Sequence, residues 1–132
     1  MNLAEQAKTY REQGNYQLAL TYAGGGDSAE CLAEKSLALN WLGRTDEAIE
    51  TARQAVQKAE AIQSVQVDCL IALGGSEISG GKYEQALISG KAAKRIDSKE
   101  DPERTARILI LLSGANAAMG NGKVSISQAR EA

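Results

Sequence analysis

Two features of this 132-residue sequence could bind a ligand or take part in a reaction: a glycine-rich segment that ends in lysine, and a pair of cysteines. Gly120-Asn121-Gly122-Lys123 has the ending of a phosphate-binding loop, in which backbone N–H groups and a lysine hold phosphate. The full pattern also needs a glycine where Ala117 stands and a serine or threonine where Val124 stands. We therefore expect no phosphate site here, and we assign Gly120 to a turn between helices.

Cys31 and Cys69 each lie twelve residues before a glycine, Gly43 and Gly81, so they occupy equivalent positions along the chain. The chain has no histidine, which removes the Cys–His nucleophile pair and the commonest general base and metal ligand. Two thiols alone do not fill the four positions of a zinc site. We expect two small buried apolar side chains, with a disulfide as the alternative. We predict no enzyme activity, no cofactor and no metal site.

Charge and hydropathy argue against several classes of partner. Fifteen Lys and Arg residues against seventeen Asp and Glu give a net charge of −2, which is not the basic footprint of a nucleic-acid-binding protein. No apolar run approaches the roughly 20 residues of a membrane span, and the first ten residues lack the pattern of a signal peptide. We expect a cytoplasmic protein that binds neither nucleic acid nor membrane. A basic stripe without interleaved aromatics is expected to be a solvated face: Lys91, Lys94, Arg95 and Lys99.

A four-fold repeat runs along the chain and predicts its architecture. Each of four glycines is followed five residues later by alanine or serine, and then by an aliphatic residue. A small residue stands seven positions before and nine positions after each glycine, and small residues let neighbouring helices pack closely. Each unit is therefore predicted to be a helix, a tight glycine turn and a second helix. The four glycines are Gly14, Gly43, Gly81 and Gly120.

The pattern predicts four helix pairs. The chain has no phenylalanine, so the core should consist of alanine and aliphatic side chains. A single proline in the whole chain favours long helices. Asp27 with Glu30 predicts the start of one helix. Asp101 before Pro102 predicts the start of another. The expected helices span residues 2–13, 16–23, 28–42, 46–60, 64–79, 83–96, 102–119 and 123–132.

This arrangement of small residue, glycine and alanine resembles the tetratricopeptide repeat family over nearly the whole chain. Tyr16 and Tyr83 match the aromatic residue that the family carries two positions after the glycine, whereas Thr45 and Gly122 depart from it. The resemblance implies an all-α fold, a right-handed superhelical array of antiparallel helix pairs. It implies a single domain over residues 1–132, with units at about 1–26, 28–61, 63–98 and 101–132.

In this family the first helix of each unit lines a concave groove, so the resemblance implies a scaffold or adaptor that binds a peptide or helix of a partner protein. Trp41 is the expected anchor, because tryptophan is enriched among interface hot spots. Ordinary packing of Trp41 within its own helix is the alternative. The resemblance assigns these residues to the groove: Lys8, Arg11, Leu37, Asn40, Trp41, Ile71, Ile78, Arg107 and Ile110.

The most apolar stretch, residues 106–119, lies near the C-terminal end and is predicted to be a buried helix. A helical array needs a polar terminal unit, because its last unit otherwise exposes a stacking face. We expect this end to be covered by further repeats, by a second copy of the chain or by another partner. The alternative function is thus a structural or regulatory segment of a larger protein that oligomerises through this end.

Overall fold

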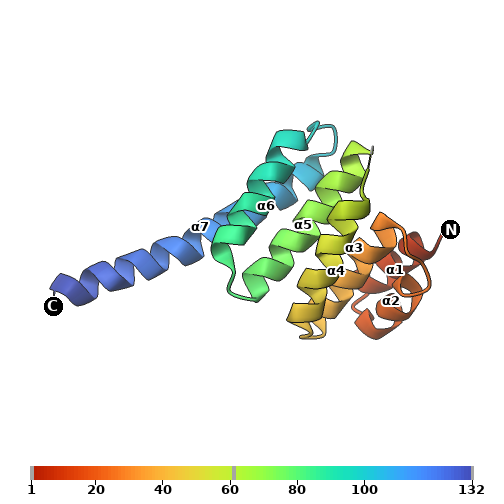
Figure 1. Ribbon diagram of the computed structural model, residues 1–132, viewed down its shortest axis with the longest axis horizontal. Coiled ribbons are helices and arrows are strands. Elements are labelled where there is room, and N and C mark those ends of the chain that lie inside the picture. Colours follow the sequence, from red (N-terminus) through yellow and green to blue (C-terminus); the bar gives the residue numbers. More distant parts are fainter. Residues whose placement is uncertain (1, 61, 132) are drawn as a thin grey trace.

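The computed structural model describes the backbone of residues 2–60 and 62–131, and the side chains within those ranges as far as residue 120. This part of the chain forms seven α-helices and no strand, as the sequence predicts (Figure 1). The helices are α1 (Leu3–Glu12), α2 (Tyr16–Ala23), α3 (Ala29–Trp41), α4 (Thr45–Lys58), α5 (Gln63–Ser79), α6 (Tyr83–Ile96) and α7 (Pro102–Glu131).

Three predicted glycine turns are confirmed, and they share one geometry. Gly14, Gly43 and Gly81 have φ values of 82°, 81° and 75°, in the left-handed region that glycine adopts without steric cost. In each turn the N–H after the glycine donates to a carbonyl five residues earlier, for example Arg44 to Leu39 at 2.9 Å. This bond ends the first helix as a Schellman motif and allows the second helix to turn back.

The fourth predicted turn is wrong: α7 continues through Gly120 to Glu131 as one helix, in place of the two expected over 102–119 and 123–132. A glycine permits a turn without requiring one, and glycine inside a helix costs only about 1 kcal/mol. The second helix of a unit also needs a side chain to hold it against the first. Tyr16, Thr45 and Tyr83 stand two positions after the turn glycines, whereas Gly122 stands there in the last unit.

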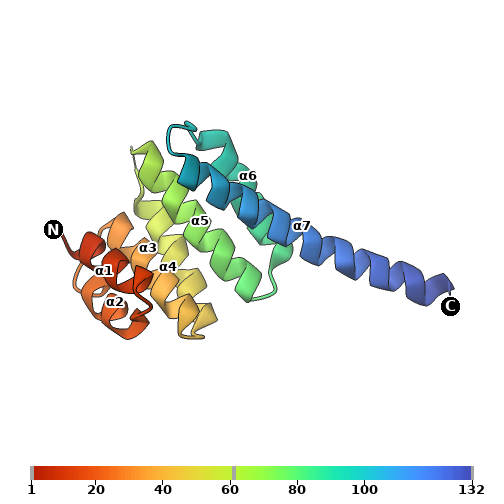
Figure 2. The same cartoon turned by 180° about the vertical axis from the view of Figure 1, so that it is seen from behind.

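The helices pack as consecutive pairs. Each pair contacts the next, and α1, α3, α5 and α7 lie in contact one after another, with α2, α4 and α6 against their other side (Figures 1 and 2). Helix α2 thus contacts α1 and α3, α4 contacts α3 and α5, and α6 contacts α5 and α7. The three helix pairs and the long final helix form a helical array.

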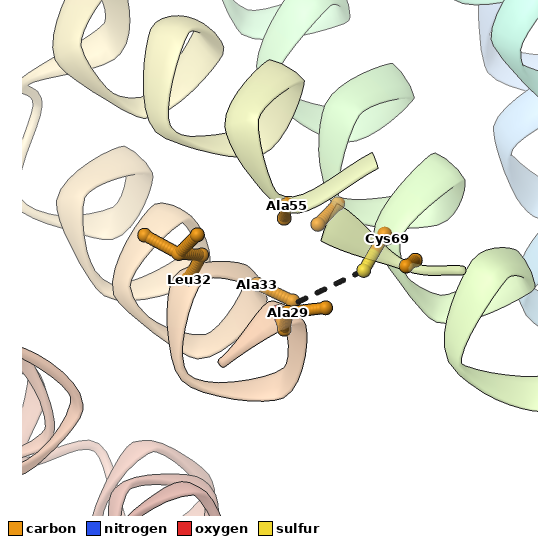
Figure 3. Packing of buried hydrophobic residues seen from close by; sticks show 7 residues of the cluster. Ala29, Leu32, Ala33, Ala55 and Cys69 are labelled. Atoms are coloured by element: carbon orange, nitrogen blue, oxygen red, sulfur yellow. Dashed lines mark hydrogen bonds between the residues drawn. The ribbon is translucent and has the colours of Figure 1, made fainter. Parts of the chain in front are cut away.

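The core is built of small side chains, as the composition predicts. One cluster joins α3, α4 and α5 through Ala29, Ala33, Ala55, Cys69 and Ala72 (Figure 3). Alanine also fills the repeated positions five residues after each turn glycine, where Ala19, Ala48 and Ala86 have no exposed surface. Side chains this short allow the backbones of neighbouring helices to approach closely.

Four of these helices, α1, α2, α3 and α7, begin with a polar side chain that caps them, and the sequence predicted a cap for α3 and for α7. Asp101 caps α7 as predicted, because its Oδ1 accepts the N–H of Glu103 at 3.0 Å. The predicted cap at Asp27 is wrong, because the neighbouring Ser28 caps α3 through a hydrogen bond from the N–H of Cys31 to its Oγ. Each of these two predicted helix starts lies within one residue of the observed start.

Helix α7 is buried on one side only, which corrects the prediction of a fully buried helix. Ile108, Leu111 and Ala115 are buried, whereas Leu109 is 51% exposed and Ile110 is 70% exposed. Among the described residues, α7 contacts α5 and α6, and its C-terminal part extends past them (Figure 2). In the described part of the chain, no helix is long and apolar enough to cross a membrane.

Candidate functional site

A groove runs across the layer formed by α1, α3, α5 and α7 and encloses about 290 Å³. It lies on the face that the family resemblance assigns to partner binding. Its lining residues are Ala4, Glu5, Lys8, Arg11, Glu30, Ala33, Glu34, Leu37, Val65, Asp68, Cys69, Ile71, Ala72 and Arg107.

The floor of the groove is apolar and follows from helical spacing. Ala33 and Leu37 lie one turn apart on α3, and Ile71 and Ala72 lie on α5 one turn after Asp68. Ala33 and Ala72 are buried small residues, so the floor is low between the longer side chains of Leu37 and Ile71. This shape suits an aliphatic side chain inserted from a partner.

Two ion pairs hold the groove's helices together. Arg11 of α1 donates from Nε to Glu34 of α3 at 2.7 Å, and both side chains are largely buried. Arg104 of α7 forms a two-point pair with Asp68 of α5, at 2.8 Å and 3.1 Å. The hydrogen bond to Asp68 raises the pKa of Arg104, so the guanidinium stays charged at every physiological pH. Such two-point pairs fix the relative position of the helices that carry them.

The remaining charges on the rim are of both signs. Glu5 and Glu30 contribute carboxylates, and Lys8 and Arg107 contribute cations. Nζ of Lys8 lies 3.9 Å from Oε1 of Glu12, and Nη2 of Arg107 lies 2.7 Å from Oε1 of Glu103. Each pair lies on the surface of one helix. Exposed pairs of this kind are weak, so these side chains can exchange their partners for a ligand at little cost.

The structure brings together part of the predicted groove set. Lys8, Arg11, Leu37, Ile71 and Arg107 line the groove.

The other predicted groove residues, Asn40, Trp41, Ile78 and Ile110, lie outside the groove lining. Ile78 lies between α5 and α7, where a Cβ added to Gly114 would be 3.6 Å from its Cδ1. Asn40 is half-buried, and its Oδ1 has no hydrogen-bond partner among the described side chains. Ile110 lies on the exposed side of α7.

Trp41, the predicted anchor, stacks on Tyr16 of α2. The ring centroids are 5.2 Å apart and the planes differ by 3°. Trp41 remains 65% exposed, so the stacked pair forms a surface feature where the first and second units meet. This packing resembles the alternative expected for Trp41, except that its partner lies on another helix.

The sequence reasoning missed five groove residues, namely Glu5, Glu34, Val65, Cys69 and Ala72. Glu34 and Ala72 both stand nine positions before their turn glycines, Gly43 and Gly81. Applying that repeat position to every unit would have found both residues. Val65 carries no comparable signal, because it lies near the start of α5.

Both cysteines are free and buried. This confirms the expectation of small buried side chains, and the alternative of a disulfide does not hold. The Sγ of Cys69 points towards Ala29 and donates to its carbonyl at 3.8 Å (Figure 3). Burial raises the pKa of Cys69 to about 12, with smaller contributions from Asp68 and Glu30. At neutral pH the buried Cys69 thiol is therefore protonated, which lowers its reactivity.

Other candidate groups carry little chemistry. Gly120 lies within α7, and the side chain of Lys123 lies outside the described residues. The stripe of Lys91, Lys94, Arg95 and Lys99 is exposed, as expected. Within the described ranges, no cluster of histidine, cysteine or carboxylate side chains could hold a metal ion.

Comparison with known proteins does not assign the chain to a family. No protein-family model matches the chain. A search of curated proteins also found no match.

Proposed function

We propose that this chain is a scaffold of the tetratricopeptide type, a right-handed superhelical array that binds a peptide or short helix of a partner protein. The groove across α1, α3, α5 and α7 carries this proposal, because it combines a low apolar floor with a rim of both charges. That combination is typical of surfaces that recognise an amphipathic segment through apolar anchors. The proposal assigns no catalytic step to the chain.

The size of the groove favours a side-chain anchor over a whole small molecule. Its volume of about 290 Å³ lies at the lower limit of the roughly 300–1,000 Å³ typical of ligand pockets. An aliphatic anchor on the partner would lie over Ala33 and Ala72, between Leu37 and Ile71. Charged residues flanking that anchor would meet Lys8 and Arg107 on the basic side, and Glu5 and Glu30 on the acidic side.

We place this binding role in the cytoplasm. Two free buried thiols support that location, since paired cysteines are the rule in oxidising compartments.

The test begins with a phage-displayed library of 16-residue peptides panned against the full chain, followed by fluorescence anisotropy with the selected peptides. Ile71→Glu places a charge on the apolar floor, and Lys8→Glu reverses one exposed rim charge without touching the core. Ile88→Glu is the matched control, because Ile88 lies exposed on α6, away from the groove.

We expect Ile71→Glu to weaken binding at least tenfold and Lys8→Glu to weaken it severalfold for peptides with acidic flanks. Ile88→Glu should bind as the wild type does. Circular dichroism checks that each variant is folded. Equal binding by the wild type and both groove variants would contradict the proposal.

A further inference from the structure

Most of the charged side chains that line the groove already lie beside an opposite charge. The two ion pairs that hold the groove's helices together use Arg11, Glu34 and Asp68. The two cations on the rim, Lys8 and Arg107, each have a glutamate one turn away on their own helix. The chain itself therefore compensates every positive charge in the groove lining.

Two carboxylates in the groove lining, Glu5 of α1 and Glu30 of α3, differ from the other charges. Both are exposed, and no cation among the described side chains forms an ion pair with either of them. Glu5 accepts one hydrogen bond, from Nδ2 of Asn2 at 3.3 Å. The groove thus presents uncompensated negative charge where α1 and α3 begin.

This negative charge lies close to the apolar floor. Glu30 precedes Ala33 by three residues, which is about 4.5 Å along the axis of α3. The floor also senses the charge, because the carboxylates of Asp68 and Glu30 add to the effect of burial in raising the pKa of Cys69. An aliphatic side chain seated over Ala33 would therefore lie within about one helical turn of the Glu30 carboxylate.

The position of these carboxylates at helix starts does not account for their place in the groove. Glu5 and Glu30 lie in the first turns of α1 and α3, where a negative charge stabilises the end of the helix. Asp46 and Glu84 have the same position in α4 and α6, and they too are exposed and in no ion pair among the described side chains. Glu5 and Glu30 differ from them in lining the groove.

We propose that the groove selects a partner segment that carries a lysine or arginine within four positions of its aliphatic anchor, and that Glu5 and Glu30 bind this cation. The inference rests on the proposed function and adds the charge of the partner to it. A cation would gain two carboxylates that are otherwise only hydrated. An acidic residue would have to compete with the glutamates already beside Lys8 and Arg107. Complementary charge of this kind selects between partners more than it adds affinity.

Two double variants of the full chain test the proposal, and each removes two negative charges from helix starts. Glu5→Gln with Glu30→Gln changes the groove. Asp46→Asn with Glu84→Gln changes α4 and α6 and is the matched control. The wild type and both variants are panned with one phage-displayed library of 16-residue peptides. The selected peptides are then synthesised with their basic residue intact and with glutamine in its place.

We expect the wild type and the control to enrich basic residues near aliphatic ones relative to the unselected library, and the groove variant to lose this enrichment. In fluorescence anisotropy a selected peptide should bind the groove variant roughly fivefold more weakly than the wild type, as expected for exposed ion pairs. The control should bind as the wild type does. Glutamine in the peptide should weaken binding to the wild type by a similar factor, with little further effect on the groove variant. Circular dichroism checks that each variant is folded.

The neutral variant Ile71→Gln separates failure of this inference from failure of the proposed function, because it alters the apolar floor without adding charge. Peptides that lose affinity for Ile71→Gln yet show no excess of basic residues would overturn the inference and leave groove binding in place. Equal weakening by the two double variants would do the same. Peptides that bind Ile71→Gln as tightly as the wild type, or a selection that yields no binder, would contradict the proposed function and this inference together.

Discussion

Leu111 of α7 lies directly against the backbone of Gly74 on α5. A Cβ added to Gly74 would be 2.6 Å from Cδ2 of Leu111 and 2.9 Å from its Cδ1, closer than carbon atoms approach. The next residue along α7 repeats this arrangement on the neighbouring helix, since a Cβ on Gly90 of α6 would be 2.7 Å from Cδ2 of Leu112. Two adjacent leucines therefore occupy the spaces left by two glycines, and this contact attaches α7 to the array.

Gly74→Ala should destabilise the fold even though alanine favours helix formation. The added methyl group overlaps Leu111, which is buried, so Leu111 must shift within a packed interior. Overpacking of this kind costs about 1–3 kcal/mol, against about 1 kcal/mol gained in helix propensity.

The matched control for Gly74→Ala is Gly75→Ala, because nothing lies within 4 Å of a Cβ at that position. We expect Gly75→Ala to raise the free energy of unfolding in urea by about 0.5–1 kcal/mol, from helix propensity alone. A similar gain for both variants would show that α7 does not pack closely on Gly74.

The difference between a turn glycine and a helical glycine gives a second prediction. Gly43 has a φ of 81°, so Gly43→Ala should cost about 1–2 kcal/mol. Gly120 lies inside α7 with open space where a Cβ would be, so Gly120→Ala should stabilise the chain by up to about 1 kcal/mol. Thermal unfolding followed by circular dichroism measures both. If Gly120→Ala destabilised the chain as much as Gly43→Ala does, Gly120 would form the turn that the repeat pattern predicts, and α7 would not continue through it.

Glu77 makes stability depend on pH. Its side chain is 4% exposed and accepts a hydrogen bond from Ser89 Oγ at 2.6 Å. Burial raises the pKa of Glu77 above its ordinary value of 4.5, although Ser89, Arg53 and Lys82 act in the opposite direction. The folded state therefore binds the proton more tightly than the unfolded state does. The stability contributed by the protonated acid is fully present below the unfolded pKa and is lost as pH rises through the folded pKa.

Glu77→Gln keeps an acceptor for Ser89 and removes this titration. We expect the variant to be more stable than the wild type at pH 7, with the difference shrinking as the pH falls to 4. Urea unfolding at several pH values measures both proteins. A wild type that gains stability relative to Glu77→Gln as pH rises from 4 to 7 would contradict the assigned direction.

The stack of Trp41 on Tyr16 predicts a structural role for the only tryptophan in the chain. Trp41→Ala and Tyr16→Ala should each lower the free energy of unfolding. A double-mutant cycle should give a coupling of about 0.5–1.5 kcal/mol between them, as is typical of aromatic pairs. Binding of groove peptides should not change in Trp41→Ala. A large loss of peptide affinity in a folded Trp41→Ala protein would instead return Trp41 to the binding site.

The parts of the fold that the sequence predicted well depend on local chemistry. A left-handed glycine such as Gly43 ends its helix through bonds within a few residues, and buried alanines such as Ala48 recur at fixed helical spacing. These features need no knowledge of distant contacts. The continuation of α7 was harder to predict, because Gly120 permits both a turn and a helix, and the choice depends on whether a second helix can pack back.

The groove shows the same division. Leu37 and Ile71 follow from the face on which each first helix carries its apolar residues. The stacking of Trp41 depends on Tyr16, which lies on α2 in the preceding unit, so it is a contact between units that spacing along one helix does not reveal. The ion pair of Arg11 with Glu34 likewise joins two units, and neither charge reveals its partner from spacing along one helix.

The most direct test of peptide binding in the groove is a map of where a selected peptide contacts the folded chain. We would record amide chemical shifts of the isotope-labelled full chain while adding a peptide from the phage selection. Binding in the groove predicts shifts concentrated at Ala33, Leu37, Ile71 and Ala72 on α3 and α5, with Ile88 on α6 unchanged. Shifts concentrated on α2, α4 and α6, with the groove residues unaffected, would contradict the proposed function.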